Sequence, residues 1–126
     1  MSVLTKKIYY HDTDCGGVVY YANYLKYFEE ARTEYLREKG IDLKELSSKG
    51  ILFVVRKVDI DYKAPARYAD TLDISTEITR IKNVSLEFFQ QVKRDGQILV
   101  SAKTVLVCIN SEFQPHPMPQ DIIENL

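Results

Sequence analysis

The sequence predicts an α+β domain in which one long helix packs against a five-stranded antiparallel sheet. Two features of the hydrophobic pattern carry this prediction. Apolar residues recur every three or four positions in one segment, 21–39, and they alternate with polar residues in the segments after residue 50. The chain has 126 residues, the size of one ordinary domain, so we expect a single domain over residues 1–126.

Residues 2–10 open the chain with the alternation that is typical of a strand. Segment 11–22 breaks this pattern and contains the pair Gly16 and Gly17. Two consecutive glycines release the backbone from its usual φ limits and let other groups approach it closely. We therefore expect an irregular loop between the first strand and the helix.

The long helix is expected from about Tyr21 or Asn23 to Lys39. Asp42 is placed to cap a short second helix that ends near Ser48. The apolar side of the long helix is formed by residues three or four positions apart, namely Tyr24, Phe28, Ala31 and Tyr35.

Four further strands are expected in the second half of the chain. Three of them alternate, and the last becomes continuously apolar over residues 105–109, which predicts a strand covered on both faces. The pair Asp95 and Gly96 predicts a hairpin turn before that strand. The strands are expected at about residues 58–63, 72–79, 86–92 and 98–110, followed by a helical turn at 120–125.

One helix laid on one sheet covers only one of its faces. If the other face is apolar, it needs a partner. We therefore expect a homodimer that is joined edge to edge and can assemble further into a homotetramer.

The composition excludes several classes of protein. The net charge of −1 lacks the basic excess of proteins that bind nucleic acids or membrane surfaces. No segment has the length of a transmembrane helix, and the first residues lack the apolar stretch of a signal peptide. Cys15 and Cys108 lie far apart and form no CxxC pair, which suits a reducing compartment. A cytoplasmic protein without an integral membrane segment is expected.

Residues 9–32 bring together the groups that acyl transfer requires. Asp12 and Asp14 supply carboxylates, which can attack a carbonyl carbon or activate a water molecule. The start of the long helix supplies backbone N–H groups with a partial positive charge of about half a unit, suited to a developing oxyanion. The glycine pair keeps the approach to these groups open.

The segment YYHDTDCGGVVYYANYLKYFEEAR, residues 9–32, resembles the signature of the hotdog-fold acyl-CoA thioesterases of the 4-hydroxybenzoyl-CoA thioesterase family. It is most similar to the YbgC-like branch, which is associated with the bacterial Tol–Pal system. FVVRKVDIDYKAPARYAD (53–70) and VLVCI (105–109) also resemble that branch, so the resemblance spans nearly the whole chain. It implies a hotdog fold and an enzyme that hydrolyses acyl-coenzyme A to a free acid and coenzyme A. Coenzyme A is then part of the substrate, and no metal or other cofactor is implied.

The same resemblance implies roles for individual residues. Asp14 corresponds to the catalytic carboxylate, as nucleophile or general base, and the backbone N–H of Tyr21 polarises the thioester carbonyl. Tyr10 corresponds to a tyrosine of the site. The YbgC-like branch usually has a histidine where this chain has Tyr21. If that histidine assists proton transfer, this chain must use the tyrosine as a hydrogen-bond donor, or water alone, in its place. The residues implied in substrate binding are Gly17 and Val18 in the loop and Arg80, Lys82 and Ser85 near the nucleotide.

Less specific interpretations exist for these residues. Asp14 can be a turn residue that bonds its own backbone before the glycines, and Asp12 is better explained as a brace of the loop. His11 with the two aspartates suggests a metal site only weakly, because neighbouring residues of an extended backbone point to opposite sides. The cations suited to phosphate groups can equally be solvated charges at strand ends, and they are Arg56, Lys57, Arg67, Arg80 and Lys82.

Two other functions compete with the thioesterase. A hotdog hydro-lyase is disfavoured because His116 follows the last strand, whereas the histidine motif of that class leads into the central helix. A non-catalytic module that binds acyl-CoA or a protein is favoured only by the missing histidine at position 21. A Tol–Pal-associated protein or a lipid-synthesis protein is the partner that the resemblance suggests.

Overall fold

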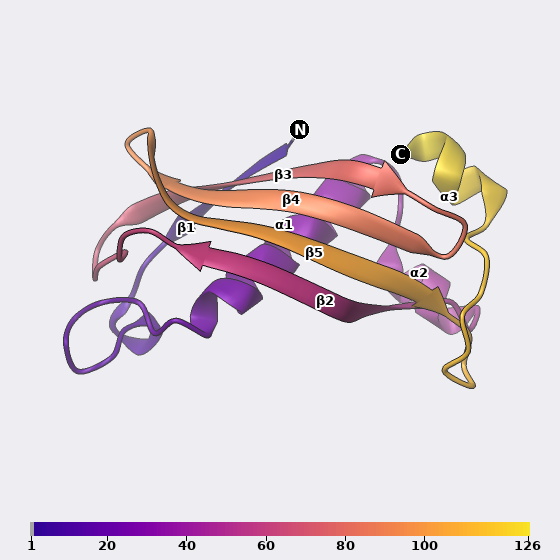
Figure 1. Ribbon diagram of the computed structural model, residues 1–126, viewed down its shortest axis with the longest axis horizontal. Coiled ribbons are helices and arrows are strands. Elements are labelled where there is room, and N and C mark those ends of the chain that lie inside the picture. Colours follow the sequence, from indigo (N-terminus) through magenta and orange to yellow (C-terminus); the bar gives the residue numbers. More distant parts are fainter. Residues whose placement is uncertain (1) are drawn as a thin grey trace.

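The computed structural model describes residues 2–126, which form one antiparallel sheet with a long helix across one face (Figure 1). The strands lie in the order β1-β3-β4-β5-β2. This arrangement confirms the predicted class of one long helix and five antiparallel strands. The elements are β1 (Ser2–Lys7), α1 (Asn23–Glu38), α2 (Leu43–Ser48), β2 (Leu52–Tyr62), β3 (Thr71–Ile81), β4 (Ser85–Arg94), β5 (Gln97–Ile109) and α3 (Gln120–Asn125).

The local signals in the sequence locate most element ends. The carboxylate of Asp42 accepts hydrogen bonds from the N–H groups of Lys44 (2.9 Å) and Glu45 (3.4 Å), so the predicted cap of α2 is confirmed. Asp95 and Gly96 both have positive φ, +50° and +80°, as a tight hairpin turn requires. The chain therefore turns between β4 and β5 where predicted.

Two strands differ in extent from the prediction. β1 ends at Lys7, and its pairing continues only as far as the N–H of Ile8, which donates to the carbonyl of Asp70 (2.9 Å) just before β3. The 3-10 turn at Tyr10–Asp12 then takes the chain out of the sheet. β2 begins at Leu52, six residues earlier than expected. A β-bulge at Arg56 shifts the pairing with β5, and it breaks the alternation that would have marked the first half of the strand.

The core lies between α1 and the face of the sheet that it covers. Tyr27, Phe28 and Leu36 are fully buried against this inner face. One polar cluster lies inside it: Arg32 donates to the side-chain oxygen of Gln90 (3.1 Å), and the Gln90 amide donates to the carbonyl of Phe28 (3.0 Å). Because these groups satisfy one another, the helix is fixed at one position on the sheet.

The outer face of the sheet is largely polar, so the condition under which it would need a partner is not met. Glu77, Gln91 and Lys103 lie on it between a few apolar residues. Val105 and Val107 are only half-buried, so the prediction that this run is covered on both faces is wrong for the single chain. Exposed apolar residues gather instead at the edge strand β2, at Val54, Val55 and Val58. No helix within residues 2–126 has the length and apolar character needed to cross a membrane.

Candidate active site

The loop between β1 and α1 has a narrow base, which we call the neck, where Asp12 joins the two sides of the loop. This residue is buried at the end of a single 3-10 turn, Tyr10–Asp12. Its backbone carbonyl accepts from the N–H of Tyr20 (3.1 Å) and from the side-chain amide of Asn23 (2.9 Å). A β-bridge between Thr13 and Val19 closes the neck one residue further on. The interpretation of Asp12 as a brace of the loop agrees with this geometry.

Asp14 opens a tight turn at the tip of the loop. The N–H of Asp14 donates to the carbonyl of Val18 (2.9 Å), and the N–H of Gly17 donates back to the carbonyl of Asp14 (3.1 Å). One carboxylate oxygen, Oδ1, accepts from the N–H of Gly16 (2.8 Å). Asp14 therefore bonds its own turn, as the structural interpretation expects, while its other oxygen, Oδ2, has no hydrogen bond within residues 2–126.

Each glycine of the pair has its own reason to be there. Gly17 has a φ of +79°, a conformation that side chains disfavour. At Gly16, a Cβ atom would lie 3.2 Å from Oδ1 of Asp14 and would crowd the carboxylate. The glycine pair thus shapes the turn that presents Asp14, whose side chain is exposed in the single chain.

Just before α1, one backbone N–H of the chain is left as an unused hydrogen-bond donor. The N-cap residue, Ala22, provides no side chain to cap the helix. The N–H of Asn23 donates to the carbonyl of Tyr20 (2.9 Å), but in the described part of the chain the N–H of Tyr21 has no acceptor. An unpaired N–H at a helix start is suited to bind an oxyanion.

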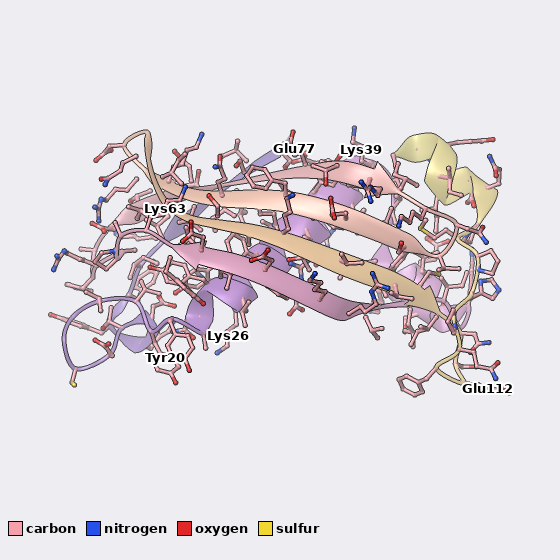
Figure 2. All side chains as sticks on the ribbon, viewed as in Figure 1. Tyr20, Lys26, Lys39, Lys63, Glu77 and Glu112 are labelled. Carbon is pink, nitrogen blue, oxygen red and sulfur yellow. The ribbon has the colours of Figure 1, made fainter. Side chains whose placement is uncertain are left out.

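Tyrosine rings surround the loop. The ring of Tyr10 is exposed and stacks on that of Tyr68, with centroids 3.8 Å apart. Figure 2 shows Tyr20 at this end of the molecule, near the start of α1. A pocket of about 300 Å³ lies beside the helix start; it is lined by Val19, Tyr21, Tyr24, Tyr62, Lys63, Ala64 and Pro65. Neither Asp14 nor Tyr10 lines this pocket.

A second segment, 64–70, supports the loop from the side. The N–H of Val19 donates to the carbonyl of Ala66 (2.8 Å), and Val18 forms a β-bridge with Arg67. The segment is held in turn by Asp70, which accepts from the guanidinium of Arg94 (2.7 Å). Burial alone would raise the pKa of Asp70, but the hydrogen bonds and charges of Arg94 and Arg67 outweigh it and hold that pKa below its ordinary value.

The other implied binding residues meet in a different place. A pocket of about 180 Å³ on the outer face of the sheet is lined by five cationic side chains, two acidic ones, Ser85 and Val105. Its cations are Arg56, Lys57, Arg80, Lys82 and Lys103, and its acids are Asp59 and Glu87. We call this the cationic pocket. The structure thus brings Arg80, Lys82 and Ser85 together, and it places Arg67 elsewhere, beside the loop.

Two β-bulges help to concentrate these cations. The pairing of β2 with β5 shifts at Arg56, and the pairing of β3 with β4 shifts next to Arg80. A bulge turns an extra side chain out of the regular alternation, so consecutive residues such as Arg56 and Lys57 can line one pocket. Lys103 was missed as a candidate, because only the register of β5 against β2 and β4 places it there.

Within a single chain, the loop that carries Asp14 and the cationic pocket lie at opposite ends of the sheet. Lys7, where the loop leaves the sheet, pairs with Thr71 at the start of β3, whereas Arg80 lies near the end of that strand. Nine residues of strand span roughly 30 Å. Figure 1 shows the loop at one end of the sheet and the turn from β3 to β4 at the other. No cluster of side chains suited to hold a metal ion occurs in residues 2–126.

Comparisons with known proteins place the chain in a family. Residues 9–126 match the model of the thioesterase-like superfamily. The acyl-CoA thioester hydrolase YbgC of Escherichia coli O6:H1 is 41% identical over 119 residues, which are 93% of this chain and 89% of that protein. The acyl-CoA thioesterase YbgC of Haemophilus influenzae is 36% identical over 92% of this chain and 87% of its own length.

Solved structures agree. A probable thioesterase from Bartonella henselae has a TM-score of 0.90 and 35% identity, covering 94% of this chain and 98% of that one. A gentisyl-coenzyme A thioesterase has a TM-score of 0.91 and 30% identity, covering 97% and 99%. The predicted hotdog fold, thioesterase activity and YbgC-like resemblance are confirmed by these relatives. The chain belongs to the thioesterase-like superfamily, as a hotdog-fold enzyme similar to the YbgC acyl-CoA thioesterases.

Proposed function

We propose that this thioesterase hydrolyses acyl-coenzyme A to a free acid and coenzyme A, with Asp14 as nucleophile or general base. The observation that carries the proposal is the loop itself. Asp14, with one free carboxylate oxygen, and the unpaired N–H of Tyr21 lie on either side of the neck that Thr13 and Val19 close. Relatives named acyl-CoA thioesterases support the same substrate class.

The reaction follows from these two groups. As a general base, Asp14 takes a proton from water, and the resulting hydroxide attacks the carbonyl carbon while the Tyr21 N–H stabilises the oxyanion. The C–S bond then breaks, and the leaving thiolate recovers a proton from Asp14. As a nucleophile, the Asp14 carboxylate attacks the carbonyl carbon, and the C–S bond breaks to give a mixed anhydride and the coenzyme A thiolate, which takes a proton from water. Water then hydrolyses the anhydride to the free acid and the Asp14 carboxylate. Neither route needs a metal or another cofactor.

With tyrosine at position 21, the backbone N–H of this residue can still serve as the oxyanion donor. The hydroxyl of Tyr62 donates to the carbonyl of Tyr21 (3.1 Å), which fixes this peptide relative to β2. Tyr10, whose ring stacks on that of Tyr68, is proposed to border the acyl group. Gly17 and Val18 are proposed to leave the loop backbone open to the approach of the substrate. The side chain of Tyr21 then assists only as a hydrogen-bond donor.

The cationic pocket is proposed to bind the phosphate groups of coenzyme A. Arg80, Lys82 and Ser85 line it, as the resemblance implies, and Arg56 and Lys103 add further charge. Guanidinium groups bind phosphate oxygens with paired, charge-assisted hydrogen bonds. With five cations against two acids, the pocket keeps a net positive charge suited to an anionic ligand.

The distance between the two sites supports a homodimer, and by further pairing a homotetramer. The edge strand β2 is long and exposes Val54, Val55 and Val58, which is typical of a strand that pairs with another chain. Antiparallel pairing of two β2 strands around a two-fold axis would place Leu52 of one copy opposite Tyr62 of the other. The loop of one copy would then meet the cationic end of the other, and the active site would form between them.

Release of thiol from a panel of acyl-CoA esters tests the proposal. We expect wild-type protein to release coenzyme A and Asp14→Asn to be slower by at least about a hundredfold. Asp121→Asn, which removes an exposed carboxylate on α3, is the matched control and should keep full activity. An Asp14→Asn variant that is as fast as wild type would exclude Asp14 from the chemistry.

The same assay separates the competing functions. A wild type that binds acyl-CoA but never releases thiol would be a non-catalytic module, for which the tyrosine at position 21 is the one supporting feature. Loss of water from a hydroxyacyl-CoA without thiol release would indicate a hydro-lyase. A cytoplasmic location and a Tol–Pal-associated or lipid-synthesis partner stay predictions.

A further inference from the structure

Asp12 joins two distant parts of the chain through its side chain. It is only 5% exposed, and its carboxylate has a donor on each oxygen. The hydroxyl of Tyr27, on the second turn of α1, donates to Oδ1 (2.7 Å), and the N–H of Tyr9 donates to Oδ2 (2.9 Å). The carboxylate therefore links the end of β1 to the interior of the helix.

The backbone carbonyl of the same residue binds the other side of the loop. Tyr20 and Asn23 both donate to it, and they flank Tyr21, whose N–H is the proposed oxyanion donor. Asp14 follows Asp12 by two residues. Asp12 thus lies between the two proposed catalytic groups and has direct bonds to the segments that carry them.

We propose that Asp12 and Tyr27 are positioning residues, which hold the Asp14 carboxylate and the Tyr21 N–H at the separation that thioester hydrolysis requires. The inference rests on the proposed function and adds two residues that touch neither substrate nor reacting atoms. If the hydroxyl of Tyr27 is lost, one buried carboxylate oxygen of Asp12 has no hydrogen-bond donor. The neck of the loop can then move so that water reaches this oxygen. A displacement of about 1 Å at a catalytic group can slow the chemical step by up to about a hundredfold.

The surroundings keep the pair in the states that this bond requires. Burial alone would raise the pKa of Asp12, but the donors Tyr9 and Tyr27 and the charges of His11 and Lys6 outweigh it and hold that pKa below its ordinary value. Burial and the bond to Asp12 raise the pKa of Tyr27 far above its ordinary value, so its hydroxyl remains a donor. The cavity beside the pair, about 380 Å³, is also lined by Lys26, Glu29 and Glu30.

The test compares three variants in the thiol-release assay. Tyr27→Phe removes only the hydroxyl, and we expect kcat to fall between about tenfold and a hundredfold with KM within about twofold. Asn23→Ala removes a donor to the carbonyl of Asp12 and should show the same selective loss of kcat. Tyr35→Phe is the matched control: its ring is buried on the same helix, and its hydroxyl has no hydrogen bond to another described residue. Its kcat should stay within about twofold of wild type.

The pH profile gives a readout that a purely structural role would not move. Without the Tyr27 donor, Asp12 binds a proton at higher pH, so the acid limb of kcat should move to higher pH in Tyr27→Phe and stay in place in Tyr35→Phe. A folded Tyr27→Phe with wild-type kcat and profile would overturn the inference and leave the proposed function standing. If Tyr27→Phe does not fold, a wild-type kcat in Asn23→Ala overturns it equally. Absence of thiol release by wild type would overturn both.

Discussion

Glycine at positions 16 and 17 has two separate physical causes, although the two residues are neighbours. Gly17 is required by its backbone, with a φ of +79°, and Gly16 is required by the space that the Asp14 carboxylate occupies. The sequence predicted an irregular loop here but could not distinguish the two causes, because neither φ nor a contact can be obtained from composition. Asp14 illustrates the same limit. Its bond to the Gly16 N–H fulfils the turn interpretation and still leaves one oxygen for chemistry.

A Gly17→Ala substitution should lower both stability and activity. We expect the free energy of unfolding to fall by about 1–2 kcal/mol, since a side chain disfavours positive φ, and thiol release to fall with it because the turn that presents Asp14 is strained. Gly40→Ala is the matched control, as Gly40 has the same φ of +79° after α1 and no atom within 4 Å of the added Cβ. It should lose stability in urea denaturation but keep its activity. Equal activity loss in both variants would contradict this assignment.

The pockets are formed by the way strands and helices are arranged, and not by a few adjacent residues. The caps and turns of the fold were predictable because each depends on a few adjacent residues, such as Asp42 or the pair Asp95 and Gly96. The cationic pocket was not predictable, because its side chains come from four strands whose register and bulges depend on the whole sheet. The bulge at Arg56 also hid the first half of β2 from the alternating pattern. The pairing between distant strands therefore determines this pocket, which the local periodicity of the sequence could not predict.

Loss of cations from this pocket should weaken binding without slowing the chemistry. For Arg80→Ala and Lys103→Ala, we expect KM for acyl-CoA to rise about tenfold each, with kcat nearly unchanged, because each removes one charge-assisted bond to phosphate. Lys44→Ala, an exposed lysine on α2, is the control and should behave as wild type. Steady-state kinetics at two salt concentrations measure the effect. An unchanged KM in both pocket variants would remove coenzyme A from this pocket.

The segment 64–70 should lose stability in acid through Asp70. Its folded pKa is depressed, so its contribution is complete above 3.8, the ordinary value, and is lost as the pH falls through the folded pKa. We expect Asp70→Asn to unfold about 1 kcal/mol more easily than wild type at pH 7. The difference should shrink as the pH falls below the ordinary value, when the wild-type carboxyl is also protonated. Urea denaturation at both pH values measures it, and a difference that is constant with pH would exclude the ion pair as the cause.

The whole molecule has two unlike edges. β1 is short, whereas β2 is long and carries exposed valines, so the β2 edge is the one expected to pair with a second copy. The outer face would need a partner only if it were apolar, and its charges make it an inferior candidate, in line with the predicted edge-to-edge dimer. Position on an edge follows from strand order, which the sequence did not reveal.

A charge on the β2 edge should separate the copies and abolish activity together. We expect Val55→Lys to sediment as a monomer and to lose most thiol release, because the proposed site needs both chains. Val3→Lys introduces the same charge at an exposed valine of β1 and should change neither property. A fully active Val55→Lys monomer would show that one chain is sufficient.

The separation of the loop from the cationic pocket has a genetic consequence. If each site takes Asp14 from one subunit and Arg80 from the other, an inactive Asp14→Asn subunit and an Arg80→Ala subunit that binds acyl-CoA weakly can together form one intact site. In a mixed pair of Asp14→Asn and Arg80→Ala subunits, one site collects both lesions and the other is free of them. Co-expression of the two defective alleles would then restore hydrolysis at acyl-CoA concentrations below the raised KM of Arg80→Ala, whereas a catalytic centre confined to a single polypeptide would show no such complementation.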